Sequence, residues 1–233
     1  GRDDLALERA RALNLAGKWQ EALALLTSRS FVPCEGGEHA NAEQYMFAHY
    51  ALGRAALLEG DARAAAEHFR AAQKLPDNLG AGLWNEALLV PHKYYEGVCL
   101  RMLGDEEAAR ACFRYVADMP KDFFSDMHLP ELPCYQALAA RALGEEAVAL
   151  QLAARHYQAW QRKRETRSAG FYKTTPFFIA YTEDAAQTRD WNCDYHCGFA
   201  LLCLPGRETE GKALLERCDP TQLYGALMHR IGC

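Results

Sequence analysis

The 233-residue sequence lacks several features that would decide its class at once. It has no apolar run near the roughly 20 residues that a helix needs to cross a bilayer, and its charged start, Gly1-Arg2-Asp3-Asp4, has no apolar secretory segment. Basic residues are not in excess, since 26 Lys and Arg stand against 31 Asp and Glu, for a formal charge of −5. We therefore expect no membrane insertion and no nucleic-acid binding, which needs a concentrated basic face.

Cysteine usage gives no sign of a disulfide framework. The nine cysteines are an odd number, and most lie in apolar helical patterns, where a free thiol behaves as a small hydrophobe. A reducing, cytoplasmic setting is the simpler expectation.

What the sequence does have is an internal repeat. Four segments share an apolar helix, a Gly turn and a second helix with Ala five residues after the turn glycine. The turn glycines are Gly17, Gly60, Gly104 and Gly144, which lie 40 to 44 residues apart. Repetition at such a period is the signature of stacked helical units that share one core.

The second and third copies are the most complete, and their small residues have structural reasons. Gly60 and Gly104 are expected in the left-handed conformation that ends a helix. A glycine seven residues before each turn predicts a close approach of the paired helices, and the alanine after the turn fills the same contact. A Phe nine residues after the turn is expected to close the pair, and a proline to end its second helix. These residues are Gly53, Ala65, Phe69 and Pro76 in the second copy and Gly97, Ala109, Phe113 and Pro120 in the third.

These offsets resemble the tetratricopeptide repeat. A standard repeat has about 34 residues, and the surplus here falls in linkers at roughly 30–42, 76–90 and 120–131. The resemblance implies an all-α fold: a right-handed α-α superhelix of about five helix pairs with long inter-repeat linkers. We expect repeats one to four over residues 1–165, an irregular aromatic-rich connector over 166–191 and a degenerate C-terminal helix pair over 192–233, all in one continuous solenoid domain.

The connector leaves two alternatives open. Residues 171–179 are aromatic, β-branched and interrupted by Pro176. They either pack as an extended stretch over the solenoid or belong to a further short helix over 176–187.

Four phrases narrow the resemblance. They are Pro33-Cys34-Glu35-Gly36-Gly37-Glu38, Pro76-Asp77-Asn78-Leu79-Gly80, His92-Lys93-Tyr94-Tyr95-Glu96-Gly97 and Asn192-Cys193-Asp194-Tyr195-His196-Cys197. With them the chain resembles the C-terminal repeat region of a family of large bacterial proteins, in which an uncharacterised galactose-mutarotase-like β-sandwich domain precedes the repeats. The resemblance implies that this β-rich portion, suspected of binding or acting on carbohydrate, is absent here. The abrupt helical start likewise predicts a fragment of a longer protein. Where the family usually has Trp after the Pro, this chain has Cys34.

One group of side chains in the sequence could hold a metal ion. Cys193, His196 and Cys197 would lie on one helical face as three ligands. No fourth ligand is evident nearby in the sequence, so packing in the core is the favoured interpretation, and we expect no metal and no cofactor.

The first linker contains the candidates for catalysis. Cys34 and His39 lack an orienting third group and an oxyanion hole, so a nucleophilic role is disfavoured. Glu35 and Glu38 could serve acid–base chemistry on a sugar, but two carboxylates in one loop are more often solvated or cap the helix that starts near Asn41. The glycines of this linker and Gly80 in the next fit no phosphate-binding loop. We expect no enzyme.

The first helix of each stacked pair lines the concave face of a solenoid. On a common register this face carries Phe47, Tyr50 and Arg54 in the second copy, Tyr94, Val98 and Arg101 in the third, and Leu138 and Arg141 in the fourth. Aromatic rings beside Arg suit an acidic protein or peptide segment, or a stacked sugar. The alternative is that these Tyr residues pack against neighbouring linkers and the Arg residues are solvated.

The linkers form a second candidate surface, at one edge of the solenoid. They carry bulky apolar residues, Phe31, Trp84 and Phe123-Phe124, and the polar candidates Glu35, Gly36, Gly37, Glu38, Asn78 and Gly80. The apolar residues either pack as caps over the helices or dock the missing β-rich domain, and docking is the favoured alternative. The sequence thus predicts a non-catalytic interaction or scaffolding module, whose partner is a protein or peptide, the β-sandwich domain of the same parent chain, or a second copy in a homodimer. The alternative is an accessory part of a glycoside-active enzyme, in which the linker loops complete a neighbouring active site.

Overall fold

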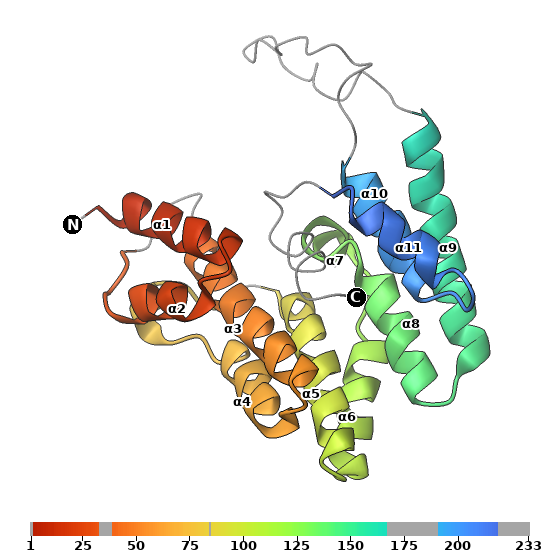
Figure 1. Ribbon diagram of the computed structural model, residues 1–233, viewed down its shortest axis with the longest axis horizontal. Helices are drawn as coiled ribbons and strands as arrows, with labels where there is room; N and C mark the ends of the chain where they lie inside the picture. Colours follow the sequence, from red (N-terminus) through yellow and green to blue (C-terminus); the bar gives the residue numbers. More distant parts are fainter. Residues whose placement is uncertain (1, 33–38, 84, 167–190, 219–233) are drawn as a thin grey trace.

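The computed structural model describes residues 2–32, 39–83, 85–166 and 191–218. Within these ranges the chain forms α-helices and two short 3-10 helices and contains no strand, which confirms the all-α prediction (Figure 1). The α-helices are α1 (Asp3–Leu15), α2 (Trp19–Thr27), α3 (Ala40–Leu58), α4 (Ala62–Ala72), α5 (Val90–Met102), α6 (Glu106–Ala117), α7 (Phe123–His128), α8 (Leu132–Ala142), α9 (Glu146–Thr166), α10 (Trp191–Leu202) and α11 (Glu208–Leu215). The 3-10 helices are η1 (Asp77–Leu79) and η2 (Glu86–Leu89).

Ten of these helices form five consecutive pairs, each joined by a glycine turn. Gly60 and Gly104 both have φ of +85°, in the left-handed region, as predicted. The turn glycines of the other three pairs, Gly17, Gly144 and Gly206, have φ between +77° and +87°. After two of the turns an aspartate caps the second helix, because the Asp61 and Asp105 carboxylates accept from backbone N–H groups three residues on.

The close approach predicted inside the second and third pairs is present. A Cβ atom added at Gly53 would lie 2.7 Å from Cζ of Phe69, and one at Gly97 would lie 2.9 Å from Cε1 of Phe113. Both phenylalanines are buried. The aromatic ring therefore occupies the space that the missing glycine side chain leaves.

The fifth pair follows the same pattern with smaller residues. Gly211 stands five residues after the turn glycine Gly206, where the second copy has Ala65, and Leu215 takes the place of Phe69. A Cβ atom at Gly198 would lie 2.9 Å from the carbonyl oxygen of Gly211. Backbone therefore packs on backbone here, which is why an Ala-and-Phe pattern finds this copy only weakly.

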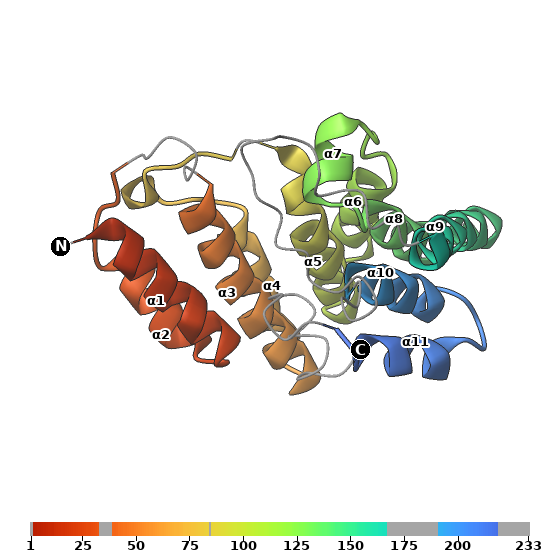
Figure 2. The same cartoon turned by 90° about the horizontal axis from the view of Figure 1, so that it is seen from above.

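Successive pairs pack in chain order, through α2 and α3, α4 and α5, α6 and α8, and α9 and α10. The turns α3–α4, α5–α6 and α8–α9 lie along one edge, the lower edge of Figure 1. Figure 2 shows α7 and the linker that carries η1 and η2 at the upper edge of the view. The linker over 120–131 is partly helical, because Asp122 and Ser125 form a capping box that starts α7.

Most of the predicted connector lies outside the described residues, including the helix considered over 176–187. In the described part of the chain, α9 ends at Thr166 and α10 begins at Trp191. None of the described helices combines the length and apolarity that a membrane span requires.

Candidate interaction surfaces

The predicted concave residues of α3 are buried. Phe47, Tyr50 and Arg54 are 2%, 1% and 7% exposed. The hydroxyl oxygens of Tyr50 and Tyr135 lie 3.3 Å apart, although α3 and α8 belong to the second and fourth pairs. Three consecutive pairs therefore curve so tightly that the first helix of one reaches the first helix of the next but one.

Arg54 lies inside this contact. Its Nη1 donates to the hydroxyl oxygens of Tyr95, at 2.9 Å, and of Tyr50, at 3.3 Å, and its guanidinium lies 4.7 Å from the centre of the Tyr95 ring. Burial alone lowers the pKa of Arg54, but the phenol groups of Tyr50 and Tyr95 raise it, and the net direction is upward. Arg54 thus stays charged while it joins α3 to α5.

Tyr94 packs into the same aromatic cluster. Its ring centre lies 5.0 Å from that of Tyr95, 5.8 Å from that of Phe113 and 6.1 Å from that of Tyr135. Burial, followed by the neighbouring Cys203 thiol, raises the pKa of Tyr94 to about 12. The two tyrosine rings that the sequence assigned to a ligand, Tyr50 and Tyr94, therefore contact their neighbours in the fold.

Arg101 and Arg141 form the same clamp in two successive pairs. Arg101 Nη2 donates to the Ala142 carbonyl oxygen at 3.0 Å, while Nε and Nη2 bind the Glu106 carboxylate at 3.0 and 2.9 Å. Arg141 Nη2 donates to the Cys203 carbonyl oxygen at 2.9 Å, while Nε and Nη2 both bind the Glu146 carboxylate at 3.0 Å. Each Arg thus ties its own pair together and reaches the end of the first helix of the next pair.

The other concave candidates, Val98 and Leu138, are half-buried and pack against the main core. The Tyr rings and Arg side chains of the predicted concave face thus contact neighbouring helix pairs. Both Arg101 and Arg141 already hold a carboxylate, so an acidic ligand would have to displace a glutamate.

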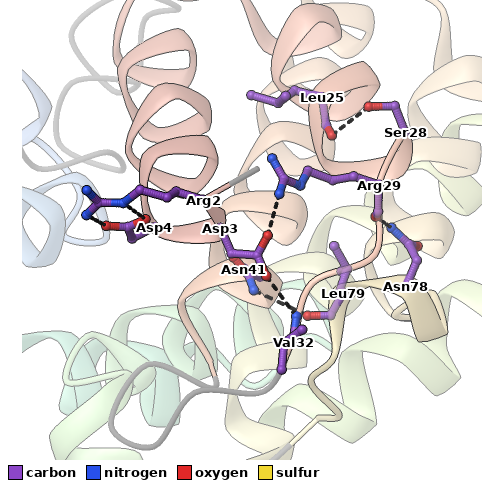
Figure 3. Close-up of polar contacts among 10 residues, drawn as sticks. All are labelled: Arg2, Asp3, Asp4, Leu25, Ser28, Arg29, Val32, Asn41, Asn78 and Leu79. Carbon is purple, nitrogen blue, oxygen red and sulfur yellow. Dashed lines mark hydrogen bonds and ion pairs between the residues drawn. The ribbon is translucent and has the colours of Figure 1, made fainter.

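Of the predicted linker residues, Asn78 has a clear structural role (Figure 3). Its Nδ2 donates to the carbonyl oxygens of Leu26, at 2.8 Å, and Arg29, at 2.7 Å. These carbonyls lie at the end of α2 and just beyond it, where intrahelical donors are missing. The Asn78 carbonyl oxygen accepts from the Phe31 N–H at 2.7 Å, so the second linker is fastened to the first.

Two neighbouring contacts complete this linker junction. Asn41 Nδ2 donates to the Leu79 carbonyl oxygen at 3.3 Å, and the Asp3 carboxylate accepts from the Val32 N–H at 3.0 Å. Gly80 ends η1 with φ of +65°, a conformation that favours glycine. Residues 33–38, with Cys34, Glu35, Gly36, Gly37 and Glu38, lie outside the described residues, as does Trp84.

The bulky linker residues differ in burial. Phe31 is buried in the core of the first pair, whereas Phe123 is exposed at the start of α7. The side chain of Phe124 lies outside the described part.

Cys193, His196 and Cys197 are all buried in α10, as core packing predicts. The His196 ring stacks on Trp160 with ring centres 3.8 Å apart. Burial, followed by His156 and Lys163, holds the pKa of His196 well below its ordinary value. In the described residues no group of three or more His, Cys, Asp or Glu side chains is arranged to hold a metal ion.

The structure adds two glutamates that sequence reasoning missed. Glu96 joins α4 to α5, because its carboxylate accepts from Arg70, Gln73 and Lys93 at 2.8 to 3.1 Å. Burial raises its pKa, but these donors outweigh the burial and lower it. Glu131, directly before α8, accepts a hydrogen bond from the Tyr195 hydroxyl at 3.3 Å, and burial raises its pKa to about 7.

A carboxylate inside an apolar run was the signal in the sequence that could have identified both glutamates.

No protein-family model matches the sequence, and no solved structure matches the chain.

Proposed function

We propose that this chain is a non-catalytic interaction or scaffolding module, a right-handed superhelix of the tetratricopeptide type. The observation that carries the proposal is the repeated clamp of Arg101 and Arg141, which fixes one pair on the next in the same way twice. Such repetition builds an extended, stiff surface, and stacked helical repeats use surfaces of this kind to bind partners.

Two classes of partner follow from the sequence. One is the β-sandwich domain that the family resemblance places before the repeats in the same parent chain. The other is an independent protein or peptide, or a second copy of the chain. Because the concave side is filled around Tyr50 and Tyr135, we place the partner on an edge or on the outer helices. The described cysteines are free thiols, all buried except the half-buried Cys218, and this suits a reducing, cytoplasmic setting.

The glycoside-enzyme alternative depends on Glu35 and Glu38, which lie outside the described residues. Buried carboxyl groups elsewhere give it little support, since Glu96 is held by three donors and Glu131 is covered by the core.

The test is capture of a partner by the full chain from an extract of its source, followed by reconstitution from purified components. We expect a stoichiometric complex whose Kd can be measured by titration calorimetry. A panel of chromogenic glycosides is assayed in parallel, alone and with the partner. Turnover that disappears in Glu35→Gln or Glu38→Gln would overturn the scaffold proposal, and so would failure to reconstitute any complex.

A further inference from the structure

Four large apolar side chains are exposed along the edge where the glycine turns lie. Leu58, Met102, Leu103 and Val148 are between 45% and 61% exposed. They come from the turns of the second, third and fourth pairs, which line the lower edge of Figure 1. None of the four belongs to the hydrophobic clusters of the described core. We call these four residues the apolar rim.

The first two residues of the apolar rim occupy equivalent positions of the repeat. Leu58 and Met102 each stand two residues before a turn glycine, so stacking brings them to equivalent positions in neighbouring pairs. The next equivalent residue is the small Ala142, where Arg101 makes its clamp. Single exposed apolar residues are common on proteins, but apolar residues at equivalent positions of two neighbouring turns, with Leu103 and Val148 at the same edge, are typical of a contact surface.

Carboxylates flank the apolar rim. Glu59, Asp61, Asp105 and Glu107 are exposed in the same two turns as Leu58, Met102 and Leu103. The cations nearest to the third and fourth turns are neutralised, since Arg101 binds Glu106 and Arg141 binds Glu146. Arg63, in the first turn of α4, is the one cation of the second turn. The edge is thus apolar with an acidic border.

We propose that the apolar rim binds an amphipathic helix of a partner protein, with an apolar stripe bordered by Lys and Arg. This inference rests on the proposed scaffolding function and names the surface it uses. An apolar stripe covers the four side chains, and basic residues beside it meet the carboxylates of the second and third turns.

The charge of the border excludes other occupants. Nucleic acid and anionic lipid would bring phosphates to Glu59, Asp61 and Glu107, and this juxtaposition is repulsive. A second copy docking by the same edge would place carboxylates opposite carboxylates, because a two-fold contact uses the same surface twice.

The test measures binding of three fluorescein-labelled peptides of about 18 residues, long enough for five helical turns, to the full chain by fluorescence anisotropy. The first is a Leu/Lys peptide whose leucines form one helical stripe. The second has the same composition in an order without a stripe, and the third replaces Lys by Glu. Two variants probe the rim, Met102→Ser/Leu103→Ser and Glu59→Gln/Glu107→Gln. Leu5→Ser is the matched control, an exposed leucine near the start of α1.

We expect the striped basic peptide to bind at least about tenfold more tightly than the other two. The Met102→Ser/Leu103→Ser variant should lose about tenfold or more in affinity. The Glu59→Gln/Glu107→Gln variant should weaken binding mainly at low salt, and Leu5→Ser should bind like the wild type.

Equal binding of the striped and the unstriped basic peptides would overturn the inference, and so would an unaffected rim variant. A shift from dimer to monomer in Met102→Ser/Leu103→Ser, seen by analytical ultracentrifugation, would assign the rim to a second copy instead. If the rim variant still captures the partner found in extracts, this inference fails while the scaffolding function stands.

Discussion

The hydroxyl groups of Tyr50 and Tyr135 meet at 3.3 Å across an intervening helix pair. The two residues stand 85 positions apart and belong to the second and fourth pairs, so the contact joins two helix pairs that are not consecutive. Arg54 and Tyr95 fill the space beside it. The predicted concave residues of α3 are therefore part of the core.

Replacement of Tyr135 by Phe tests this contact. Tyr50 keeps its hydrogen bond from Arg54, so we expect a loss of about 1 kcal/mol in the free energy of unfolding, the usual worth of one hydrogen bond. Urea denaturation followed by circular dichroism measures it. Tyr115→Phe is the control, since this tyrosine is only half-buried and lies on α6, and it should change stability by less than about 0.5 kcal/mol. Equal effects of the two changes would show that the contact contributes nothing.

Gly53→Ala tests the packing of Phe69 on the glycine. Alanine favours a helix by about 1 kcal/mol over glycine, but its Cβ would lie 2.7 Å from the buried Phe69 ring and cost about 1–3 kcal/mol through overpacking. We expect a net loss of stability of up to about 2 kcal/mol in urea denaturation. Gly82→Ala, which has no atom within 4 Å of the added Cβ, should be close to neutral. Phe69→Leu should relieve part of the loss in the Gly53→Ala background, so the two changes should not be additive.

Arg101→Lys tests the clamp between the third and fourth pairs. A lysine has one ammonium group and cannot bind the two Glu106 oxygens and the Ala142 carbonyl together. We expect a loss of about 0.5–1.5 kcal/mol, and a similar loss for Arg141→Lys. Arg110→Lys, on the exposed face of α6, is the matched control. A double-mutant cycle with Glu106→Gln should give a coupling energy above about 0.3 kcal/mol, and an additive result would contradict the clamp.

The sequence predicts the roles of residues whose conformation or contacts depend only on residues of the same helix pair. Gly60 needs a left-handed conformation and Gly53 faces Phe69 nine residues beyond the turn, so a pattern within one pair is enough to find both. The burial of Tyr50 and Arg54 depends on contacts with Tyr135 and Tyr95, which belong to the next two pairs. Asn78 binds carbonyl groups about 50 positions earlier in the chain, a contact that no local pattern encodes. A position on the first helix of a pair therefore does not tell whether the residue lies on an open face or is buried between pairs.

Acid should destabilise the fold through its buried histidines. Burial, with His49 nearby, lowers the pKa of His92 to about 3, and burial, with His68 nearby, lowers that of His49 to about 4. Both values lie below the ordinary 6.5, so the unfolded chain binds more protons. Stability is present above pH 6.5 and falls as the pH drops towards 4, by up to about 1.4 kcal/mol per pH unit for each proton.

His92→Leu checks this prediction in urea denaturation between pH 7.5 and 4.5. His92 is fully buried and neither of its ring nitrogens has a hydrogen-bond partner in the described part of the chain, so an apolar replacement should not lower stability at pH 7.5 by more than about 1 kcal/mol. The variant should lose less stability on acidification than the wild type. An unchanged pH dependence would mean that His92 does not contribute.

Glu131 should have the opposite effect on the pH dependence of folding stability. Its pKa is raised to about 7 by burial, above the value of about 4.5 for the unfolded chain, so the protonated carboxyl favours folding. The stability from this group is complete below pH 4.5 and is lost as the pH rises through 7. Glu131→Gln keeps an oxygen for the Tyr195 hydroxyl and cannot ionise, so we expect it to stabilise the protein by about 1–3 kcal/mol at pH 8. The difference should shrink towards zero near pH 4.5. Urea denaturation at both pH values measures this, with Glu107→Gln as the exposed control, and a gain of the same size at both would show that Glu131 does not titrate with folding.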